Sequence, residues 1–300
     1  MLKSAFAQCL RRVRFGRAPF RGQTRLADAA GKLAAWANSD AGKSSPSAGL
    51  QLETDLRDRI QRQMWAGVYE PHVRECFEAL LRPGDTYFDV GGHIGYHASL
   101  AALRTGATGR VIAFEADPAM HAKLAANLRQ FPWATAVQSA VWEHSGTLEF
   151  ERTSDRNESG WGTLTAVRDL RQGEHFPVPS TTLDDYCSRA KVERLDAMKI
   201  DAEGSELGIL RGARATLERF RPIIVMEINP ILLQQGGTTP DEIVDFLGGQ
   251  DYRLYTLGWK RIERWDMRKH TAFGEALCLA ESKAEDAIEM LKCRGFGVRG

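Results

Sequence analysis

Several features are scarce in this 300-residue chain. It has an odd number of cysteines, with no metal-ligand spacing between them: Cys9, Cys76, Cys187, Cys278 and Cys293. They argue against a disulfide framework and a zinc site and favour a reducing compartment, which we take to be the cytoplasm. No apolar run approaches the roughly 18–20 residues that are needed to cross a bilayer. The formal net charge of +1 gives no global reason to expect a nucleic-acid partner.

The first 27 residues contain no acid at all. Their basic residues are Lys3, Arg11, Arg12, Arg14, Arg17, Arg21 and Arg25. Apolar residues recur at helical spacing between Leu2 and Val13, which allows a short basic amphipathic helix. Residues 1–27 are interpreted as a loose arm, as a weak peripheral contact with anionic lipid, or as an organelle transit peptide. We favour the arm, and residues 38–49, rich in Ser, Ala, Gly and Pro, as its linker.

The rest of the chain has the composition of a globular protein and alternates between strands and helices. The predicted strands are 86–90, 111–115, 134–138, 197–201, 223–228, 252–257 and 275–280, with a hairpin between 148 and 178. The predicted helices are 94–103, 118–129, 183–190, 206–220 and 241–248. This alternation is typical of parallel strands with helices on both faces. We therefore predict an α/β fold, a doubly wound, mostly parallel, seven-stranded Rossmann-like sheet with an N-terminal helical extension.

The predicted units follow from this pattern. Residues 1–49 are a flexible basic arm and linker, and residues 50–82 are a charged helical cover that stops at Pro83-Gly84. Residues 83–282 carry the sheet, and residues 283–300 form a C-terminal helix and tail.

A glycine-rich loop follows the first predicted strand. The strand ends at Asp89, and Gly91 and Gly95 lie in the loop that leads into a helix. Such a loop lets backbone N–H groups approach a ligand, and the helix N-terminus adds a positive dipole. Glu115 lies 26 residues beyond Asp89, at the end of the next strand, where a carboxylate can accept both hydroxyls of a ribose. A glycine cluster alone often marks an ordinary turn, but together with Glu115 it indicates a nucleoside-binding half-site.

The glycine spacing distinguishes between cofactors. Dinucleotide-binding loops read G-x-G-x-x-G, which admits a pyrophosphate, whereas this loop reads D-x-G-x-x-x-G. An acid beside the loop would repel a pyrophosphate and suits a ligand that carries an ammonium group and no phosphate. S-adenosylmethionine is such a ligand, and we predict it as the cofactor.

Two other segments are candidates for the cofactor site. Tyr69 and Glu70 precede the first strand and either pack the helical cover onto the sheet or close over the cofactor. Ala140 follows the third strand, where a small residue leaves room for a flat base, although a core position explains it equally well.

A second charged cluster surrounds the fourth predicted strand. Lys199 and Asp201 point the same way along it, and Glu203 and Glu206 follow around a glycine. Glu227 ends the next strand at the same edge of the sheet. The acids are explained as a base for a hydroxyl proton, as ligands of a divalent cation, or as helix caps. We favour the first explanation, with Lys199, Asp201 and Glu203 as catalytic residues and no bound metal.

These motifs together resemble a known family. Their order is similar to that in the FkbM methyltransferases: Tyr69-Glu70, Asp89-Val-Gly-Gly-His-Ile-Gly-Tyr96, Ala113-Phe-Glu115, Thr182-Leu-Asp-Asp-Tyr186 and Lys199-Ile-Asp-Ala-Glu-Gly-Ser-Glu206. The resemblance covers residues 65–280 and implies a class I S-adenosylmethionine-dependent fold that methylates oxygen, typically on sugars or polyketide-like natural products. It further implies cofactor contacts from Asp89, Gly91, Gly95 and Glu115, and an acceptor site near Asp201 and Glu203.

The chain departs from the frequent family pattern D-V-G-A-N-I-G at Gly92 and His93. A neutral His93 imidazole can donate a hydrogen bond as the amide does, so we expect it to contact the cofactor. A role for His93 as a base is disfavoured, because a helix N-terminus opposes the charged form of the ring. The resemblance gives no support to residues 1–49.

The prediction is an S-adenosylmethionine-dependent O-methyltransferase that acts on a hydroxyl of a sugar, glycan or natural product. The alternatives are a catalytically silent nucleoside-binding protein and a nicotinamide-dependent oxidoreductase, which the glycine spacing disfavours. No nucleic-acid substrate is expected, because no basic face is evident outside residues 1–27. Trp161, His175 and the insertion at 154–179 are expected to shape the acceptor site, because loops carry specificity. The oligomeric state and the acceptor are left open.

Overall fold

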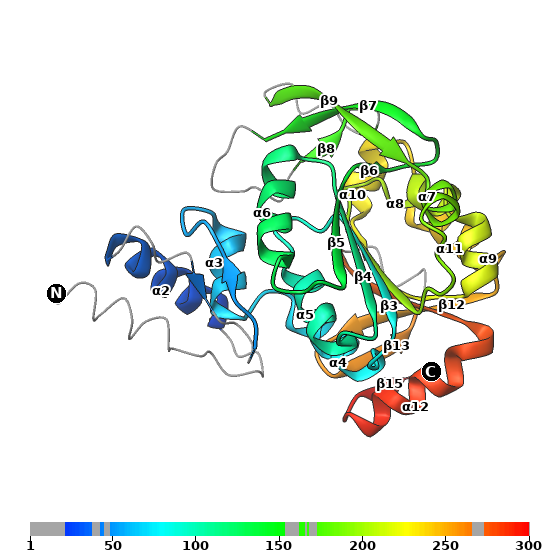
Figure 1. The fold of residues 1–300 in the computed structure, drawn as a ribbon. Helices are drawn as coiled ribbons and strands as arrows, with labels where there is room; N and C mark the ends of the chain where they lie inside the picture. Colours follow the sequence, from blue (N-terminus) through cyan, green and yellow to red (C-terminus); the bar gives the residue numbers. More distant parts are fainter. Residues whose placement is uncertain are drawn as a thin grey trace.

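The computed structural model describes residues 22–37, 43–44, 49–153, 162–165, 167, 173–265 and 273–299. Within these residues a nine-stranded sheet has the order β15-β13-β12-β14-β11-β10-β3-β4-β5 (Figure 1). Its parallel half consists of β3 (Thr86–Val90), β4 (Arg110–Glu115), β5 (Ala134–Gln138), β10 (Ala197–Ile200) and β11 (Ile223–Ile228). Its other half consists of β12 (Tyr252–Gly258), β13 (Arg261–Arg264), β14 (Gly274–Ala280) and β15 (Gly297–Arg299).

The α/β, doubly wound fold predicted from the sequence is confirmed, with two corrections to the sheet. β14 runs antiparallel to β11, and β12 runs antiparallel to β14. The strand count is nine in the described residues, because β13 and β15 extend the edge beyond β12. These two strands are short and largely charged, and only Ile262 of β13 is fully buried, so they lack a recognisable apolar pattern.

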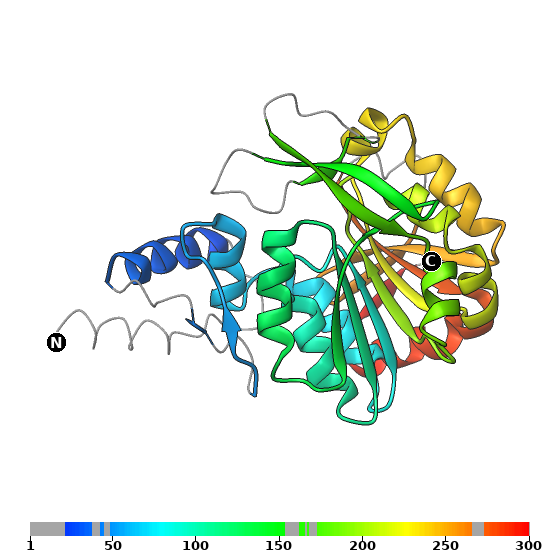
Figure 2. The same ribbon diagram turned by 45° about the horizontal axis from the view of Figure 1, so that its top comes forward.

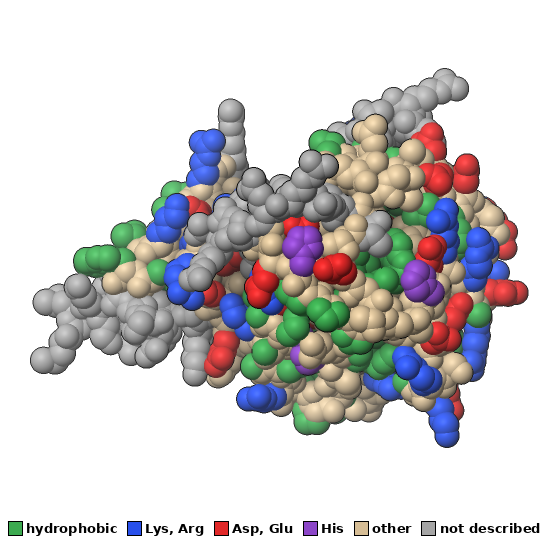
Figure 3. Space-filling model, turned by 90° about the horizontal axis from the view of Figure 1, so that it is seen from above, with side chains coloured by type: hydrophobic (Ala, Val, Ile, Leu, Met, Phe, Trp, Pro, Cys, Tyr) green, Lys and Arg blue, Asp and Glu red, His purple; other side chains and the backbone are tan. Residues whose placement is uncertain are grey.

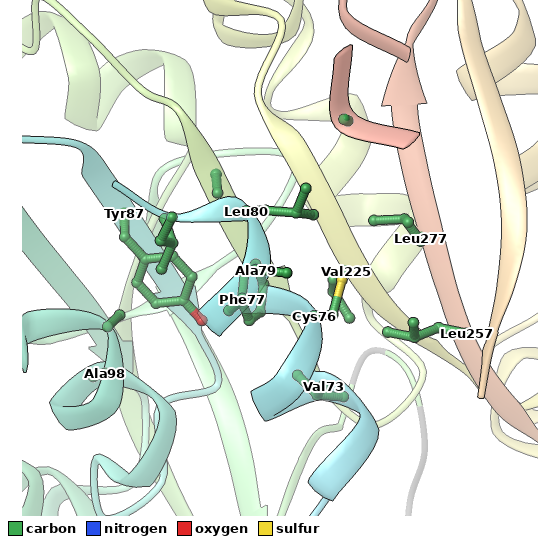
Figure 4. Close-up of a cluster of buried hydrophobic side chains, with 14 of the residues drawn as sticks. Val73, Cys76, Phe77, Ala79, Leu80, Tyr87, Ala98, Val225, Leu257 and Leu277 are labelled. Carbon is green, nitrogen blue, oxygen red and sulfur yellow. The ribbon is translucent and has the colours of Figure 1, made fainter. Parts of the chain in front are cut away.

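Helices cover both faces of the sheet (Figure 2). One face carries α4 (Pro71–Leu80), α5 (Tyr96–Thr105), α6 (Pro118–Leu128) and α12 (Glu281–Cys293). The other carries α7 (Leu183–Arg189), α8 (Glu206–Arg211), α9 (Arg214–Phe220), α10 (Pro230–Gln235) and α11 (Pro240–Gly248). Figure 4 shows the first layer, where Phe77 and Leu80 of α4 lie over Tyr87 and Val225 of the sheet. None of the helices in the described ranges is long and apolar enough to cross a bilayer.

The helix predicted at 206–220 is two helices, α8 and α9, separated at Gly212 and Ala213. Position 212 has to be glycine for a steric reason. The carbonyl of Trp142 lies so close to Gly212 that a Cβ atom there would come within 2.3 Å of the carbonyl oxygen.

A smaller sheet lies at the top of Figure 1, with the order β6-β9-β7-β8. Its strands are β6 (Ala140–Val141), β7 (Gly146–Arg152), β8 (Thr163–Leu164) and β9 (Glu174–Thr181). β7 and β9 pair antiparallel, with Leu148 opposite Val178, so the predicted hairpin is confirmed.

The N-terminal segment forms a helical unit beside α6 (Figure 2). It contains α2 (Gln23–Ala37) and α3 (Arg59–Ala66), with β1 (Lys43–Ser44) paired to β2 (Leu52–Glu53). The buried Arg62 of α3 pairs with Asp28 of α2 at 2.5 Å and donates to the carbonyl oxygens of Leu56 and Arg57. Part of the predicted arm is thus a helix docked on the cover, while residues 1–21 lie outside the described residues.

Two side chains, Asn127 of α6 and Gln130 just after the helix, clamp the backbone of the segment that contains β2. The Asn127 amide accepts from the Glu53 N–H at 2.8 Å and donates to the Glu53 carbonyl at 3.2 Å. Gln130 forms the same pair of bonds with the backbone of Gln51, at 3.0 and 2.6 Å. Asn127 is buried and also donates to the carbonyl of Ile94 at 2.7 Å, whereas Gln130 is exposed. The buried clamp therefore joins the cover to the glycine-rich loop.

These two clamps give a matched test of stability. Asn127→Ala leaves the buried Ile94 carbonyl without its donor, so we expect the free energy of unfolding to fall by about 2 kcal/mol. Gln130→Ala breaks bonds that water can replace, and its loss should stay below about 1 kcal/mol. Urea unfolding followed by tryptophan fluorescence measures both, and equal losses would contradict the role of the buried clamp.

Candidate active site

A cavity of about 480 Å³ lies at the carboxyl ends of β3, β4, β10 and β11. The chain goes from β3 to β4 on one side and later returns to β10 on the other side of β3, so this is the topological switch point at which doubly wound sheets bind ligands. Figure 3 shows the surface of the molecule from above, the side on which the small sheet lies, with acidic, histidine and hydrophobic side chains exposed there. Of the predicted site residues, all but Gly95 line the cavity: Tyr69, Glu70, Asp89, Gly91, His93, Glu115, Ala140, Lys199, Asp201 and Glu203.

Glycine is required at position 91 because two loops approach each other closely there. Its φ is +81°, and a Cβ atom there would lie 1.8 Å from the carbonyl oxygen of Asp201. The loop after β3 therefore lies directly against the loop after β10. Gly95 instead begins α5 with φ +86°, where a Cβ atom would meet Leu124 of α6 at 2.7 Å. Gly95 thus serves helix packing at a position outside the cavity.

The backbone N–H groups of the loop are already used within the protein. Those of Gly91 and Gly92 donate to the carbonyl of Phe114, at 3.1 and 2.8 Å. The N–H of His93 donates to Glu115 Oε2 at 2.8 Å. The expectation that these groups face a ligand is wrong, because the loop curls around the end of β4 and satisfies its donors there.

Glu115 is positioned by two backbone donors. Its Oε2 accepts from His93, and its Oε1 accepts from the N–H of Asp117 at 2.8 Å. Burial raises the pKa of Glu115 to about 8, although these hydrogen bonds oppose the rise. Each carboxylate oxygen can accept a second hydrogen bond, so the side chain retains the capacity to accept ligand hydroxyls.

His93 lines the cavity as a neutral imidazole. Burial lowers its pKa to about 4, partly offset by Asp58. The neutral form was expected from the helix N-terminus, but burial is the larger cause. With a pKa this low the ring is a weak proton acceptor and therefore a poor general base, in agreement with the role disfavoured from the sequence.

The buried Lys199 ammonium organises the next part of the cavity. It lies 2.5 Å from Asp201 Oδ2 and 3.6 Å from Glu70 Oε2, and Glu70 also contacts His97 Nε2 at 2.8 Å. Burial opposes its charge, but Asp201 and Glu70 raise the pKa of Lys199 well above its usual range. The charge of Lys199 and the hydrogen bond from His97 in turn lower the pKa of Glu70 against the effect of burial.

Tyr69 and Glu70 combine packing of the cover with a place in the cavity lining. The Tyr69 ring packs with its centroid 5.8 Å from those of Tyr96 and His97, which fixes the cover to α5. Both residues also line the cavity. Glu70 begins α4 with φ +37°, a left-handed conformation. Its side chain makes no cap hydrogen bond and turns to Lys199 and His97.

The acids after β10 separate into two groups. Asp201, Glu203 and Glu227 each offer an oxygen atom, and these atoms lie within 4.8 Å of one another. Glu206 is buried, and its Oε1 accepts from the N–H groups of Ala202 and Gly204, at 3.1 and 3.2 Å. Burial raises the pKa of Glu206 to about 7. Glu206 therefore holds the loop, while the other three acids face the cavity.

Some residues near the site could not be found from the sequence. Helix α3 contributes Arg59, Ile60, Gln63 and Met64 to the lining, and no motif marks how the cover docks. Glu275 begins β14 directly opposite Glu227, an arrangement that depends on the antiparallel direction of that strand.

The predicted acceptor loops are only partly brought to the cavity. Thr163 and Leu164 of the insertion line it, together with Phe150 of β7. His175 does not line it and instead lies 3.5 Å from the buried carboxylate of Glu151. Trp161 lies outside the described residues.

Comparison with known proteins identifies the family. The model of the methyltransferase FkbM domain matches residues 89–254, which is more than half of the chain. The chain belongs to the FkbM methyltransferase family. As an FkbM methyltransferase it uses S-adenosylmethionine as its cofactor.

Two curated relatives are 24% identical to this FkbM methyltransferase. The 2-O-methyltransferase NoeI of Sinorhizobium fredii matches over 212 residues, which are 65% of this chain and 86% of NoeI. The hexuronic acid methyltransferase AglP of Haloferax volcanii matches over 147 residues, which are 47% of this chain and 55% of AglP. Among solved structures, the methyltransferase FkbM of Methylobacillus flagellatus KT is 15% identical, with a TM-score of 0.42, and the match covers 76% of this chain and 56% of that one.

The cavity of this FkbM methyltransferase fits the cofactor chemically. Asp89 is buried beside the loop and supplies an acid of the kind that an ammonium group requires. Glu115 retains acceptor capacity for hydroxyls, and the small Ala140 lies in the lining. The tight approach at Gly91 keeps these groups in a single cavity.

The close approach of the two loops at Gly91 can be tested with Gly84, a glycine of similar φ, as the control. Gly91→Ala and Gly84→Ala both place a side chain at a left-handed φ, of +81° and +90°. At Gly84 the new Cβ meets nothing closer than Thr108 Oγ1 at 3.7 Å, so the cost should be about 1–2 kcal/mol. At Gly91 the clash with the Asp201 carbonyl adds to this cost, and binding of S-adenosylmethionine should fall by more than about ten-fold. Equal unfolding free energies and equal affinities in the two variants would disprove the close approach.

Proposed function

We propose that this protein transfers the methyl group of S-adenosylmethionine to a hydroxyl of a sugar or glycan. The observation that carries the proposal is the presence of two chemically different sets of carboxylates in one cavity. Asp89 and Glu115 lie at the ends of β3 and β4, and Asp201 and Glu203 lie after β10. The two curated relatives, one named a 2-O-methyltransferase and the other a hexuronic acid methyltransferase, support a sugar hydroxyl as acceptor.

The first set suits the cofactor. Glu115 would accept the ribose hydroxyls with the lone pairs that His93 and Asp117 leave open. Asp89 would face the ammonium group, and Ala140 would leave space for the base. Bound there, S-adenosylmethionine supplies an electrophilic methyl group on a sulfonium, which is already a good leaving group.

The second set suits the acceptor. In this proposal Asp201 accepts the proton of the acceptor hydroxyl as its oxygen becomes methylated, and Glu203 helps to orient that hydroxyl. Lys199 holds Asp201 by the 2.5 Å ion pair and so acts as a positioning residue. Because the leaving group is good, alignment of the two partners supplies most of the rate enhancement.

Calorimetric binding distinguishes the cofactor from its rival. We expect the full-length protein to bind S-adenosylmethionine at micromolar concentration and to show no binding of NADH. Glu115→Ala should weaken S-adenosylmethionine binding by about 1–3 kcal/mol, because it removes the buried acceptor for two hydroxyls. Binding of NADH, or undiminished binding by Glu115→Ala, would reject the assigned cofactor site.

Transfer to an acceptor separates an enzyme from a silent nucleoside-binding protein. With a methyl-labelled cofactor and a panel of glycans, Asp201→Asn should retain cofactor affinity and lose about 10²–10⁴-fold in kcat. Glu218→Gln, an exposed acid on α9, is the matched control and should turn over at the wild-type rate. Wild-type kcat in Asp201→Asn would rule out its role as base. Tight binding of S-adenosylhomocysteine with no transfer to any acceptor would favour the silent protein.

A further inference from the structure

Three carboxylates at the ends of β10 and β11 have the spacing of a cation site. Asp201 ends the β10 segment, Glu203 follows it with φ +51°, and Glu227 lies on β11. One oxygen atom from each lies within 4.8 Å of the other two. Oxygen ligands on opposite sides of a cation are about 4.1 Å apart around Mg²⁺ and about 4.8 Å apart around Ca²⁺. Three oxygen atoms within this distance of one another are close enough to share one cation.

Glu227 is the observation that distinguishes this cluster from a group of solvated acids. Its exposed fraction is only 8%, and it lines the cavity together with Asp201 and Glu203. No hydrogen bond or ion pair joins its carboxylate to another residue of the described chain. Burial and the neighbouring acids raise the pKa of Glu227 to about 11, so this carboxyl group either keeps its proton or needs a cation beside it. Glu227 is thus a largely buried acid that lines the cavity at the cluster.

Other acids add to the negative charge. Glu275 of β14 is the direct cross-strand neighbour of Glu227, so both side chains lie on the same face of the sheet. Glu275 is 5% exposed, and its Oε2 atom is buried without a hydrogen-bond partner. The nearby Lys199 ammonium is already engaged by Asp201 and Glu70.

Some oxygen atoms near the cluster are already occupied within the protein. Lys199 occupies Asp201 Oδ2, and the second oxygen of that carboxylate remains. Asn229 is excluded as a ligand, because its Oδ1 accepts from the N–H groups of Ile231 and Leu232 to begin α10. Glu206 is excluded through its bonds to the loop backbone. Three carboxylates and an open cavity match a hard cation that keeps several waters.

We propose that Asp201, Glu203 and Glu227 bind one divalent cation of the hard, oxygen-preferring class, such as Mg²⁺ or Mn²⁺. The cation lies in the cavity and presents its open coordination positions to the acceptor. There it holds an acceptor oxygen and favours loss of its proton, a role that rests on the proposed function. The binding itself does not depend on that function. Asp201 and Glu203, favoured as base and orienting group from the sequence, then act together with the ion.

The first test uses the full-length protein with Mn²⁺ alone, without cofactor or acceptor. Electron paramagnetic resonance measures free Mn²⁺ during a titration, and we expect saturable binding of a single ion per chain. Glu227→Gln and Glu203→Gln should weaken this binding by about 10–100-fold. Glu149→Gln, an exposed acid on β7, serves as the control and should bind as the wild type does. Absence of saturable binding, or equal binding by Glu227→Gln, would overturn the proposal.

A thermal measurement separates a ligand role from a purely structural role of Glu227. Without metal, Glu227→Gln should melt at or above the wild-type temperature, because it removes a buried acid that lies beside two other carboxyl groups. Addition of Mg²⁺ should raise the melting temperature of the wild type and leave that of Glu227→Gln unchanged. A lower metal-free melting temperature in Glu227→Gln, with the Mg²⁺ effect retained, would contradict the proposed site.

Measuring S-adenosylmethionine binding in the presence of a chelator separates failure of the metal site from failure of the proposed function. Loss of cofactor binding with Mn²⁺ binding intact would reject the function and leave the metal site. Cofactor binding and methyl transfer that persist under chelation, with no Mn²⁺ bound, would reject the metal site and leave the function.

Discussion

The charge balance around Lys199 is the constraint on which the rest of the site depends. One ammonium group lies buried on β10, with the carboxylates of Asp201 and Glu70 as its nearest partners. A buried ion pair is stable only while both partners remain, and loss of one leaves an uncompensated charge inside the protein. Glu70 belongs to the cover and Asp201 follows β10 of the sheet. The Lys199 ammonium therefore joins the cover to the sheet beside the cavity. Asp201 also belongs to the three-carboxylate cluster, so this ion pair links the Lys199 ammonium directly to the proposed cation site.

Close approach of two backbones gives the site its second constraint. The loop that carries Gly91 and the loop that carries Asp201 touch at a distance that only glycine permits. The cofactor half and the acceptor half of the cavity are therefore parts of one packed unit, and a displacement of either loop moves the other. The N–H groups of the glycine loop are turned toward Phe114 and Glu115. The loop serves mainly to bring acids together and less to cradle a ligand with its backbone.

The sequence predicted those parts of the fold and site that depend on local pattern. Apolar runs that end in acids identified the parallel strands, and the residues at their ends line the cavity as expected. Features that depend on tertiary contacts were not predictable. Helix α2 is stabilised through Arg62, a residue 34 positions away from its partner Asp28. Glu275 reaches the site because β14 runs antiparallel, and a single strand does not reveal its own direction. The need for glycine at position 212 arises from the carbonyl of Trp142, which is distant in the sequence.

Glu70 shows how a buried charged site limits the substitutions that can raise the thermal stability of the protein. Its left-handed backbone is of the kind that protein engineers replace with glycine or asparagine to gain heat resistance, usually by less than about 1 kcal/mol. Here the same replacement would remove one of the two carboxylates beside Lys199 and release His97 from its partner. A substitution that is favourable for the local backbone is therefore unfavourable for the molecule. Consensus or propensity-based thermostabilisation should leave this position untouched, and the same caution extends to any unusual backbone conformation that carries a buried charge.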